Sequence, residues 1–203
     1  MNIEYTPIHF TRESHIVDYL EKSLFYIESA NSIPNDWKWV ILSLHSALYN
    51  TAILACKWSN NDRIIKESIH KNPKESRHEL ISIKKALIYC QDPAIMRQSI
   101  IGKELFLSES QKENIRKITE AFRNGFEHFQ SWWWMIEIHR FPHMCIDTLD
   151  VIDFLIFKSQ NCIRFTEYQS REIRETIDKC KYTLSNSTLY KETEYFLEQE
   201  NAK

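Results

Sequence analysis

Residues 37–58 read WKWVILSLHSALYNTAILACKW and form the most apolar stretch of the chain. As a helix, one side of this stretch would present Trp37, Val40, Ile41, Leu44, Leu48, Thr51, Ala52 and Ala55. Its other side would present Trp39, Leu42, Tyr49, Ile53 and Cys56. A helix that is apolar nearly all round is buried on more than one side. We therefore expect a helix over residues 36–58 that lies at the centre of a domain or in an interface.

The composition around this stretch favours helices over sheets. The chain of 203 residues contains only two glycines, Gly102 and Gly125, and five prolines. β-Sandwiches and doubly wound sheets need many tight turns, which rely on glycine and proline. A length of 203 residues with 43% hydrophobic residues suits one domain with a sizeable core. The sequence therefore predicts a single all-α domain built from a few long helices.

Helical periodicity and capping residues predict the other helices. The first is expected to begin near residues 11–14 and to end near Asn31. Residues 108–111, Ser-Glu-Ser-Gln, have the spacing of a capping box and open a helix that runs to about His128 or Phe129. The remaining expected helices are residues 63–69, residues 77–89, a helix from Pro142 toward Gln160 or beyond, and a C-terminal one from Ser170.

Several features predict a cytoplasmic protein without a metal or cofactor. The five cysteines are odd in number, widely spaced and free of a Cys-x-x-Cys pair, which argues against a disulfide framework and a zinc site. The first ten residues carry no secretory signal pattern. Polar residues between Ser43 and Thr51 interrupt the apolar stretch, which falls short of the roughly 18 apolar residues of a membrane span. We expect no membrane association.

The charge distribution is uneven along the chain. A formal net charge of −2 gives no overall cationic field that would hold nucleic acid. Residues 62–85, however, contain seven basic and four acidic side chains, which makes this the most cationic region. Such a stretch is either a solvated surface or a rim that faces phosphate groups.

The helix that starts at Ser108 separates an apolar face from a polar one. At about 100° per residue, one direction collects Ile115, Ile118, Phe122, Phe126 and Phe129, which predicts the core face. The residues that fall off this face are Arg123, Asn124, Glu127 and His128. Asn124 and His128 are four residues apart, so the amide is placed to orient the imidazole, and Arg123 can reach the same pocket mouth.

Residues 123–128, Arg-Asn-Gly-Phe-Glu-His, match the RNxxxH form of the Arg-x4–6-His signature, and the chain resembles the HEPN superfamily of small helical domains. The motif sits late in a long amphipathic helix, after an apolar helix pair and before another helix, as in that family. The pattern of residues 126–129, Phe-Glu-His-Phe, followed shortly by Trp134 and Glu137, also resembles that of uncharacterised bacterial HEPN-like proteins. The resemblance covers about residues 10–165. It implies an all-α, HEPN-like antiparallel helical bundle with extra short helices, in one domain over residues 1–203 with a C-terminal helical extension at about 166–200.

The resemblance also implies a metal-independent endoribonuclease that cleaves single-stranded RNA through the 2′-hydroxyl and acts as a homodimer with two motifs in one cleft. Carried over by residue, Arg123 would bind the scissile phosphate, His128 would transfer protons, and Asn124 would orient His128 or contact the phosphate. Glu127 is a candidate for tuning His128. Such proteins often act as toxins with a cognate antitoxin or in phage defence. The alternatives are a non-catalytic HEPN-like module that binds a nucleotide, RNA or a protein, and a helical scaffold.

Other candidate residues have simpler explanations beside the functional ones. Arg123 and Glu127 are also spaced as a surface ion pair. Trp132 would offer a stacking plane for bases or fill the core together with its two neighbouring tryptophans, and His139 with Arg140 would extend a substrate rim. His139 and His143 have metal-like spacing, but Pro142 disfavours a continuous helix between them. We interpret His45 as a hydrogen-bonded core residue.

Overall fold

The structure is a computed structural model that describes residues 11–57, 60–66, 79–99, 101–127, 135–162 and 165–201. Its α-helices are α1 (Arg12–Ala30), α2 (Trp37–Lys57), α3 (Ile83–Gln91), α4 (Pro93–Met96), α5 (Glu109–Arg116), α6 (Arg123–Glu127), α7 (Phe141–Asp153), α8 (Glu167–Ser185) and α9 (Thr188–Asn201). Two short 3-10 turns, η1 (Pro34–Asp36) and η2 (Asp62–Ile64), and two π-helical segments, η4 (Lys117–Phe122) and η5 (Phe154–Lys158), accompany them. The predicted all-α class is confirmed.

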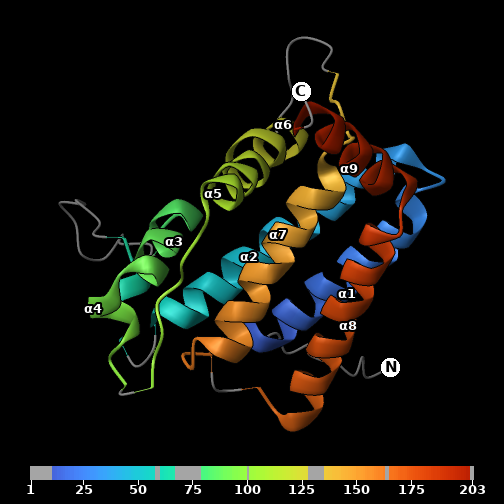
Figure 1. The fold of residues 1–203 in the computed structure, drawn as a ribbon. Coiled ribbons are helices and arrows are strands. Elements are labelled where there is room, and N and C mark those ends of the chain that lie inside the picture. Colours follow the sequence, from blue (N-terminus) through green and yellow to red (C-terminus); the bar gives the residue numbers. More distant parts are fainter. Residues whose placement is uncertain are drawn as a thin grey trace, which may run out of the picture.

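Helix α2 occupies the middle of the bundle, as its apolar pattern predicts (Figure 1). It contacts α1, α3, α6, α7 and the π-helical segment η4. The side chains of Ile41, Leu44 and Leu48 are completely buried. Burial of a side chain of this size stabilises a fold by about 1.5–3 kcal/mol. Helix α2 therefore supports η4 and α6, the two segments that carry residues 117–127.

The same helix passes a test for membrane spans. Over Pro34–Lys57 the helix is long and apolar enough to cross a bilayer, but most of its apolar part is buried inside the fold. The core helices of soluble proteins meet the same criteria. The expected cytoplasmic location and the absence of membrane association stay predictions.

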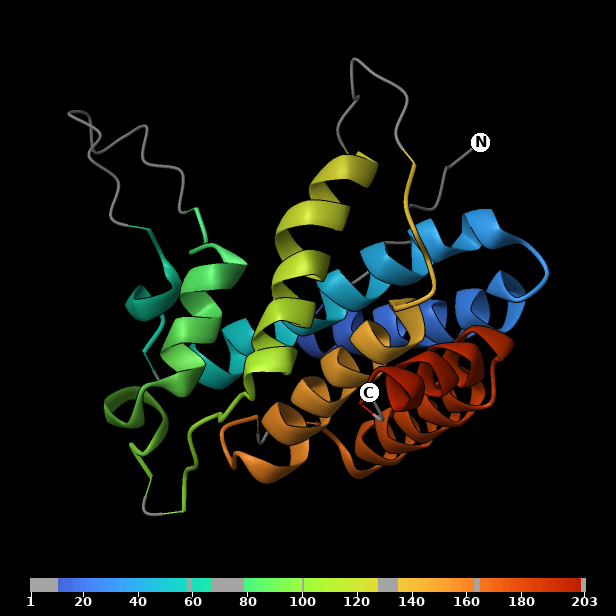
Figure 2. The same ribbon diagram turned by 45° about the horizontal axis from the view of Figure 1, so that its top comes forward.

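Helices α1 and α7 both pack against α2. Helix α8 packs against both α1 and α7, and α9 turns back onto α7 and α8 (Figures 1 and 2). Ile173, Ile177 and Leu184 of α8 are buried. The chain after residue 166 therefore contributes to the same core as α1 and α7.

The predicted helix starts are confirmed where a capping residue is present. Thr11 caps α1 and accepts a hydrogen bond from the Ser14 amide at 3.0 Å. Ser108 caps α5, with the Gln111 amide donating to the Ser108 hydroxyl and the Ser108 amide donating to Gln111 Oε1, both at 3.1 Å. This is the capping box that the sequence predicts.

Two helix predictions near the cationic region are wrong. A helix over residues 63–69 is expected, of which the structure describes residues 63–66. These four residues contain the end of η2, after which Ile65 pairs with Leu80 in an isolated antiparallel bridge. A helix over residues 77–89 is also expected, but α3 starts at Ile83, after the cap Ser82. The physical reason is pairing between two segments distant in the sequence. The amide of Ile81 donates to the carbonyl of Ile64 at 2.9 Å, and the amide of Lys66 donates to the carbonyl of Glu79 at 2.8 Å.

The later helices differ from prediction at their ends. The helix expected from Pro142 begins at Phe141 and ends at Lys158, the last residue of η5. It does not continue, because Gln160 has a φ of 62°, in the left-handed region that ends a helix. The expected C-terminal helix starts at Glu167 and is broken at Asn186 and Ser187 into α8 and α9.

Candidate functional site

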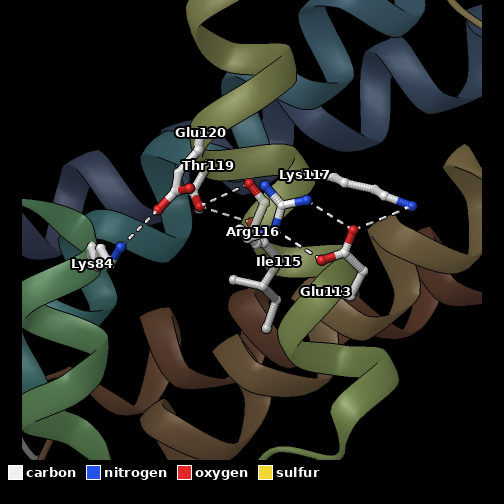
Figure 3. A network of polar contacts seen from close by, with 7 residues as sticks. All are labelled: Lys84, Glu113, Ile115, Arg116, Lys117, Thr119 and Glu120. Carbon is white, nitrogen blue, oxygen red and sulfur yellow. Dashed lines mark hydrogen bonds and ion pairs between the residues drawn. The ribbon is translucent and has the colours of Figure 1, made fainter.

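The segment before Arg123 is a π-helix rather than the uninterrupted α-helix that the sequence predicts. Within it, the hydroxyl of Thr119 donates to the carbonyl of Ile115 at 2.8 Å. Glu120 forms an ion pair with Lys84 of α3 at 3.6 Å, so α3 is tied to this segment (Figure 3). π-Helical turns inside α-helices occur frequently at functional sites. This one sets the rotation at which α6 presents residues 123–127.

The guanidinium of Arg123 is held by two neighbours on its own helix. Its Nη1 donates to Asn124 Oδ1 at 3.0 Å, and its Nη2 pairs with Glu127 Oε2 at 2.5 Å. The side chain of Arg123 is 32% exposed, and Asn124 and Glu127 are exposed residues. The prediction that these three residues lie off the core face is therefore confirmed. Phe122 and Phe126, on the predicted apolar face, pack against the core.

The third nitrogen of the Arg123 guanidinium, Nε, makes no hydrogen bond within the described residues. The Nε atom is also buried. A buried donor without a partner costs free energy, typically about 1–3 kcal/mol. Nη1 and Nη2 of Arg123 thus bind the exposed residues Asn124 and Glu127, while Nε is buried without a partner among the described residues.

Across the helix pair, His45 of α2 lies within electrostatic reach of Arg123. Burial, and after it the positive charge of Arg123, lowers the pKa of His45 from 6.5 to about 4. The imidazole is therefore neutral at pH 7. Sequence reasoning interpreted His45 as a core residue, but it is only partly buried and belongs to the surroundings of Arg123.

His45 also lies next to a second polar side chain of α2, Tyr49. Its ring lies 6.4 Å from the ring of Tyr49, one turn further along the helix. The Tyr49 hydroxyl donates to the carbonyl of Ile81 at 2.7 Å, and burial raises the pKa of Tyr49. The four-residue spacing of His45 and Tyr49 was visible in the sequence, but their place beside Arg123 and Ile81 depends on tertiary contacts between α2, α6 and the start of α3.

Two of the predicted site residues, His128 and Trp132, lie outside the described residues. Of the predicted rim, His139 and Arg140 are exposed just before α7. His139 Nδ1 lies 3.6 Å from Glu137 Oε1, and the His139 carbonyl accepts a hydrogen bond from Thr193 of α9 at 2.8 Å. The described structure brings Asn124 and Glu127 to Arg123, and His139 to α9. Figures 1 and 2 place the end of α6 and residues 135–140 at the same end of the bundle.

His143, which shares metal-like spacing with His139, has other partners. Its Nε2 lies 2.7 Å from Glu194 Oε1, and its ring stacks on Tyr190 at 4.2 Å. Among the described residues, no group of three or more histidine, cysteine or acidic side chains could hold a metal ion. All five cysteines are free and buried. His143 therefore serves to dock α9 onto α7.

The site is thus a solvent-facing arginine bracketed by an amide and a carboxylate, with a neutral imidazole behind it. Compared with family models, with curated proteins and with solved structures, the chain matches none.

Proposed function

We propose that this chain is a HEPN-type, metal-independent endoribonuclease that cleaves single-stranded RNA and acts as a homodimer. The observation that carries the proposal is the position of Arg123, on the solvent side of a helix that follows an apolar helix pair, with Asn124 and Glu127 beside it. The antiparallel α1–α2 pair before the motif and α7 after it are what a HEPN-like bundle requires. The sequence motif at residues 123–128 supplies the rest of the support.

The chemistry follows from the residue types. A guanidinium is permanently charged and planar, so Arg123 suits the charge that develops on a phosphate during cleavage. An imidazole titrates near neutral pH, so His128 suits proton transfer to or from the 2′-hydroxyl and the leaving oxygen. The 2′-hydroxyl attacks the adjacent phosphorus and the bond to the 5′-oxygen breaks. The products are a 2′,3′-cyclic phosphate and a 5′-hydroxyl.

In this scheme Glu127 and Asn124 hold the guanidinium of Arg123 until a phosphate displaces them. Both occupy nitrogens that a phosphate oxygen would take, and the carboxylate carries the same sign of charge as the phosphate. Binding of RNA would then exchange one anionic partner of Arg123 for another. The ion pair is partly exposed to solvent, and such pairs contribute only about 0.2–1 kcal/mol. Breaking it therefore costs little free energy.

The same ion pair favours a second candidate function. If Glu127 stays bound to Arg123, the chain is a non-catalytic HEPN-like module that binds a nucleotide, RNA or a protein partner. The net charge of −2 favours this alternative as well. The two functions differ in whether RNA is cut.

The deciding experiment incubates the purified protein with labelled single-stranded RNA in EDTA. We expect cleavage that yields the cyclic phosphate, no cleavage of DNA of the same sequence, and a loss of at least about 100-fold in rate for Arg123→Ala and His128→Ala. Arg116→Ala is a matched control, because Arg116 is an exposed arginine paired with Glu113 on the same long helix. Cleavage that survives both site substitutions refutes the proposed site, and RNA binding without cleavage by the wild type supports the binding module.

Two further measurements address the expected partners and role. Light scattering should give a dimer at micromolar concentration, and a monomer would contradict the shared cleft. Expression of the wild type but not of His128→Ala should arrest bacterial growth if the protein is a toxin or phage-defence effector.

A further inference from the structure

A cationic cavity of about 560 Å³ lies between η2 and the start of α3. Its walls include Arg63, Lys66, Lys85 and the ring of Tyr89, and among the described residues Asp62 is the acidic one that lines it. The cavity lies in the cationic region of residues 62–85, for which the sequence allows either a solvated surface or a rim that faces phosphate groups. It is open to solvent, and Lys66 and Lys85 are exposed residues.

The cations of this cavity are held in place by different contacts. Arg63 donates from Nη1 to the carbonyl of Cys56 at 3.0 Å, which fixes the guanidinium against the end of α2. Lys66 is paired with Glu79 at 3.1 Å. Lys85 has its ammonium 5.0 Å from the centre of the Tyr89 ring. That contact neutralises no charge, and no ion pair of Lys85 is formed within the described part of the chain, so its ammonium can attract an anion.

The cavity is joined to the surroundings of Arg123 by a short series of contacts. The carbonyl of Ile81, one of its wall residues, accepts a hydrogen bond from the Tyr49 hydroxyl. The ring of Tyr49 lies next to the ring of His45, and the charge of Arg123 lowers the pKa of His45. On the other side, Lys84 precedes Lys85 and pairs with Glu120, three residues before Arg123. Helix α3 and the α5–α6 helix run next to each other (Figures 1 and 2).

We propose that this cavity binds the backbone of the RNA strand beyond the cleaved bond, with Lys85 and Arg63 on a phosphate and Tyr89 as a stacking surface for a base. The inference rests on the proposed function, since it assigns a second contact to the same substrate. A basic groove combined with aromatic rings is the usual arrangement for single strands, because every base has a π-face and every nucleotide a phosphate. The net charge of the whole chain is negative, so a local cavity of this kind is what would bring RNA to Arg123.

The test measures binding separately from cleavage. The probe is a fluorescent single-stranded RNA with 2′-O-methyl groups throughout, which lacks the attacking hydroxyl, and anisotropy gives its Kd at several salt concentrations. We expect Lys85→Gln to weaken binding about fivefold at low salt. The slope of log Kd against log salt concentration should fall by about 0.7, the value for one lost phosphate contact with a single strand. Lys85→Arg should restore both.

The matched control is Lys179→Gln. Lys179 is an exposed lysine of α8 and lines a different cavity. Helix α8 lies on the opposite side of the bundle from α3 (Figures 1 and 2). Equal losses for Lys85→Gln and Lys179→Gln would mean that only overall charge matters and would overturn the inference, as would unchanged binding by Lys85→Gln. If the wild type cleaves RNA while Lys85→Gln binds normally, the cavity assignment fails alone. If the wild type neither cleaves nor binds RNA, the proposed function fails and the inference with it.

Discussion

The electrostatic influence of Arg123 on His45 makes a prediction that does not depend on any substrate. Burial and the charge of Arg123 lower the pKa of His45 from 6.5 to about 4. The folded state therefore binds a proton on His45 less readily than the unfolded chain, and stability is lost as the pH falls from about 6.5 toward 4. A pKa change of this size corresponds to about 3 kcal/mol when the loss is complete, and to about 2 kcal/mol between pH 7 and pH 5.

Urea unfolding at pH 7 and pH 5 measures this loss. Other titrating groups also contribute, so the informative quantity is the difference between the wild type and His45→Gln, which has no titrating group at position 45. We expect the wild type to lose about 2 kcal/mol more than the variant over this range. Equal losses in the two proteins would refute the lowered pKa of His45.

Arg123→Met separates the two causes of the shift. Removal of the guanidinium charge should raise the pKa of His45 in the folded protein, as followed by NMR titration of the imidazole carbons. Because burial is the larger cause, the pKa should recover less than half of the distance to 6.5. Arg116→Met, further along the same helix, should leave it unchanged. An unaltered pKa in Arg123→Met would mean that Arg123 does not face His45, and the site as described would be wrong.

Two other predictions concern the helix that carries the motif. Glu127→Gln should release the guanidinium and tighten binding of 2′-O-methyl RNA by up to about fivefold in anisotropy measurements, because an exposed ion pair is worth about 0.2–1 kcal/mol. Glu113→Gln, which frees Arg116 instead, should have a smaller effect. Ile118→Ala should lower the free energy of unfolding by about 2–5 kcal/mol in urea titrations, since Ile118 is completely buried in the π-helical segment. A loss below 1 kcal/mol would contradict the packing of this segment against α2.

Local signals in the sequence were sufficient for the ends of α1 and the start of α5. Thr11 and Ser108 are followed three residues later by a side chain that completes the capping box, so these boundaries depend on four adjacent residues. The central place of α2 was also predictable, because its side chains are apolar in all directions. These features are independent of how the helices are arranged.

The errors occur where partners distant in the sequence decide the backbone. Ile65 and Ile81 take extended conformations because each segment supplies hydrogen-bond partners for the other across a gap of about 15 residues. Neither segment alone distinguishes a strand-like from a helical state. The break between α8 and α9 has a different cause. It contains neither glycine nor proline, and the Ser187 hydroxyl accepts from the Tyr190 amide at 3.2 Å to start the new helix.

The candidate site was predictable only in part for the same reason. The angular positions of Asn124 and Glu127 follow from the helical repeat, and their exposure agrees with it. The π-helical segment before them was not predictable, because its wider turn depends on how residues 117–122 pack against α2 and α3. His45 and Arg123 are 78 residues apart in the sequence, and the periodicity of either helix alone does not predict that they interact.

The lowered pKa of His45 bears on which imidazole does the chemistry. With a pKa of about 4, about one His45 side chain in a thousand is protonated at pH 7, so His45 cannot serve as a general acid there. Replacement of Glu127 by a phosphate oxygen would leave one negative charge on Arg123, as before, and would not reverse this state. Because His45 is neutral, no second positive charge repels Arg123 from that side. A low pKa thus excludes His45 as the general acid, and His128 stays the proposed one. A pH–rate profile of kcat/KM should show a histidine pKa that vanishes in His128→Ala and persists in His45→Gln.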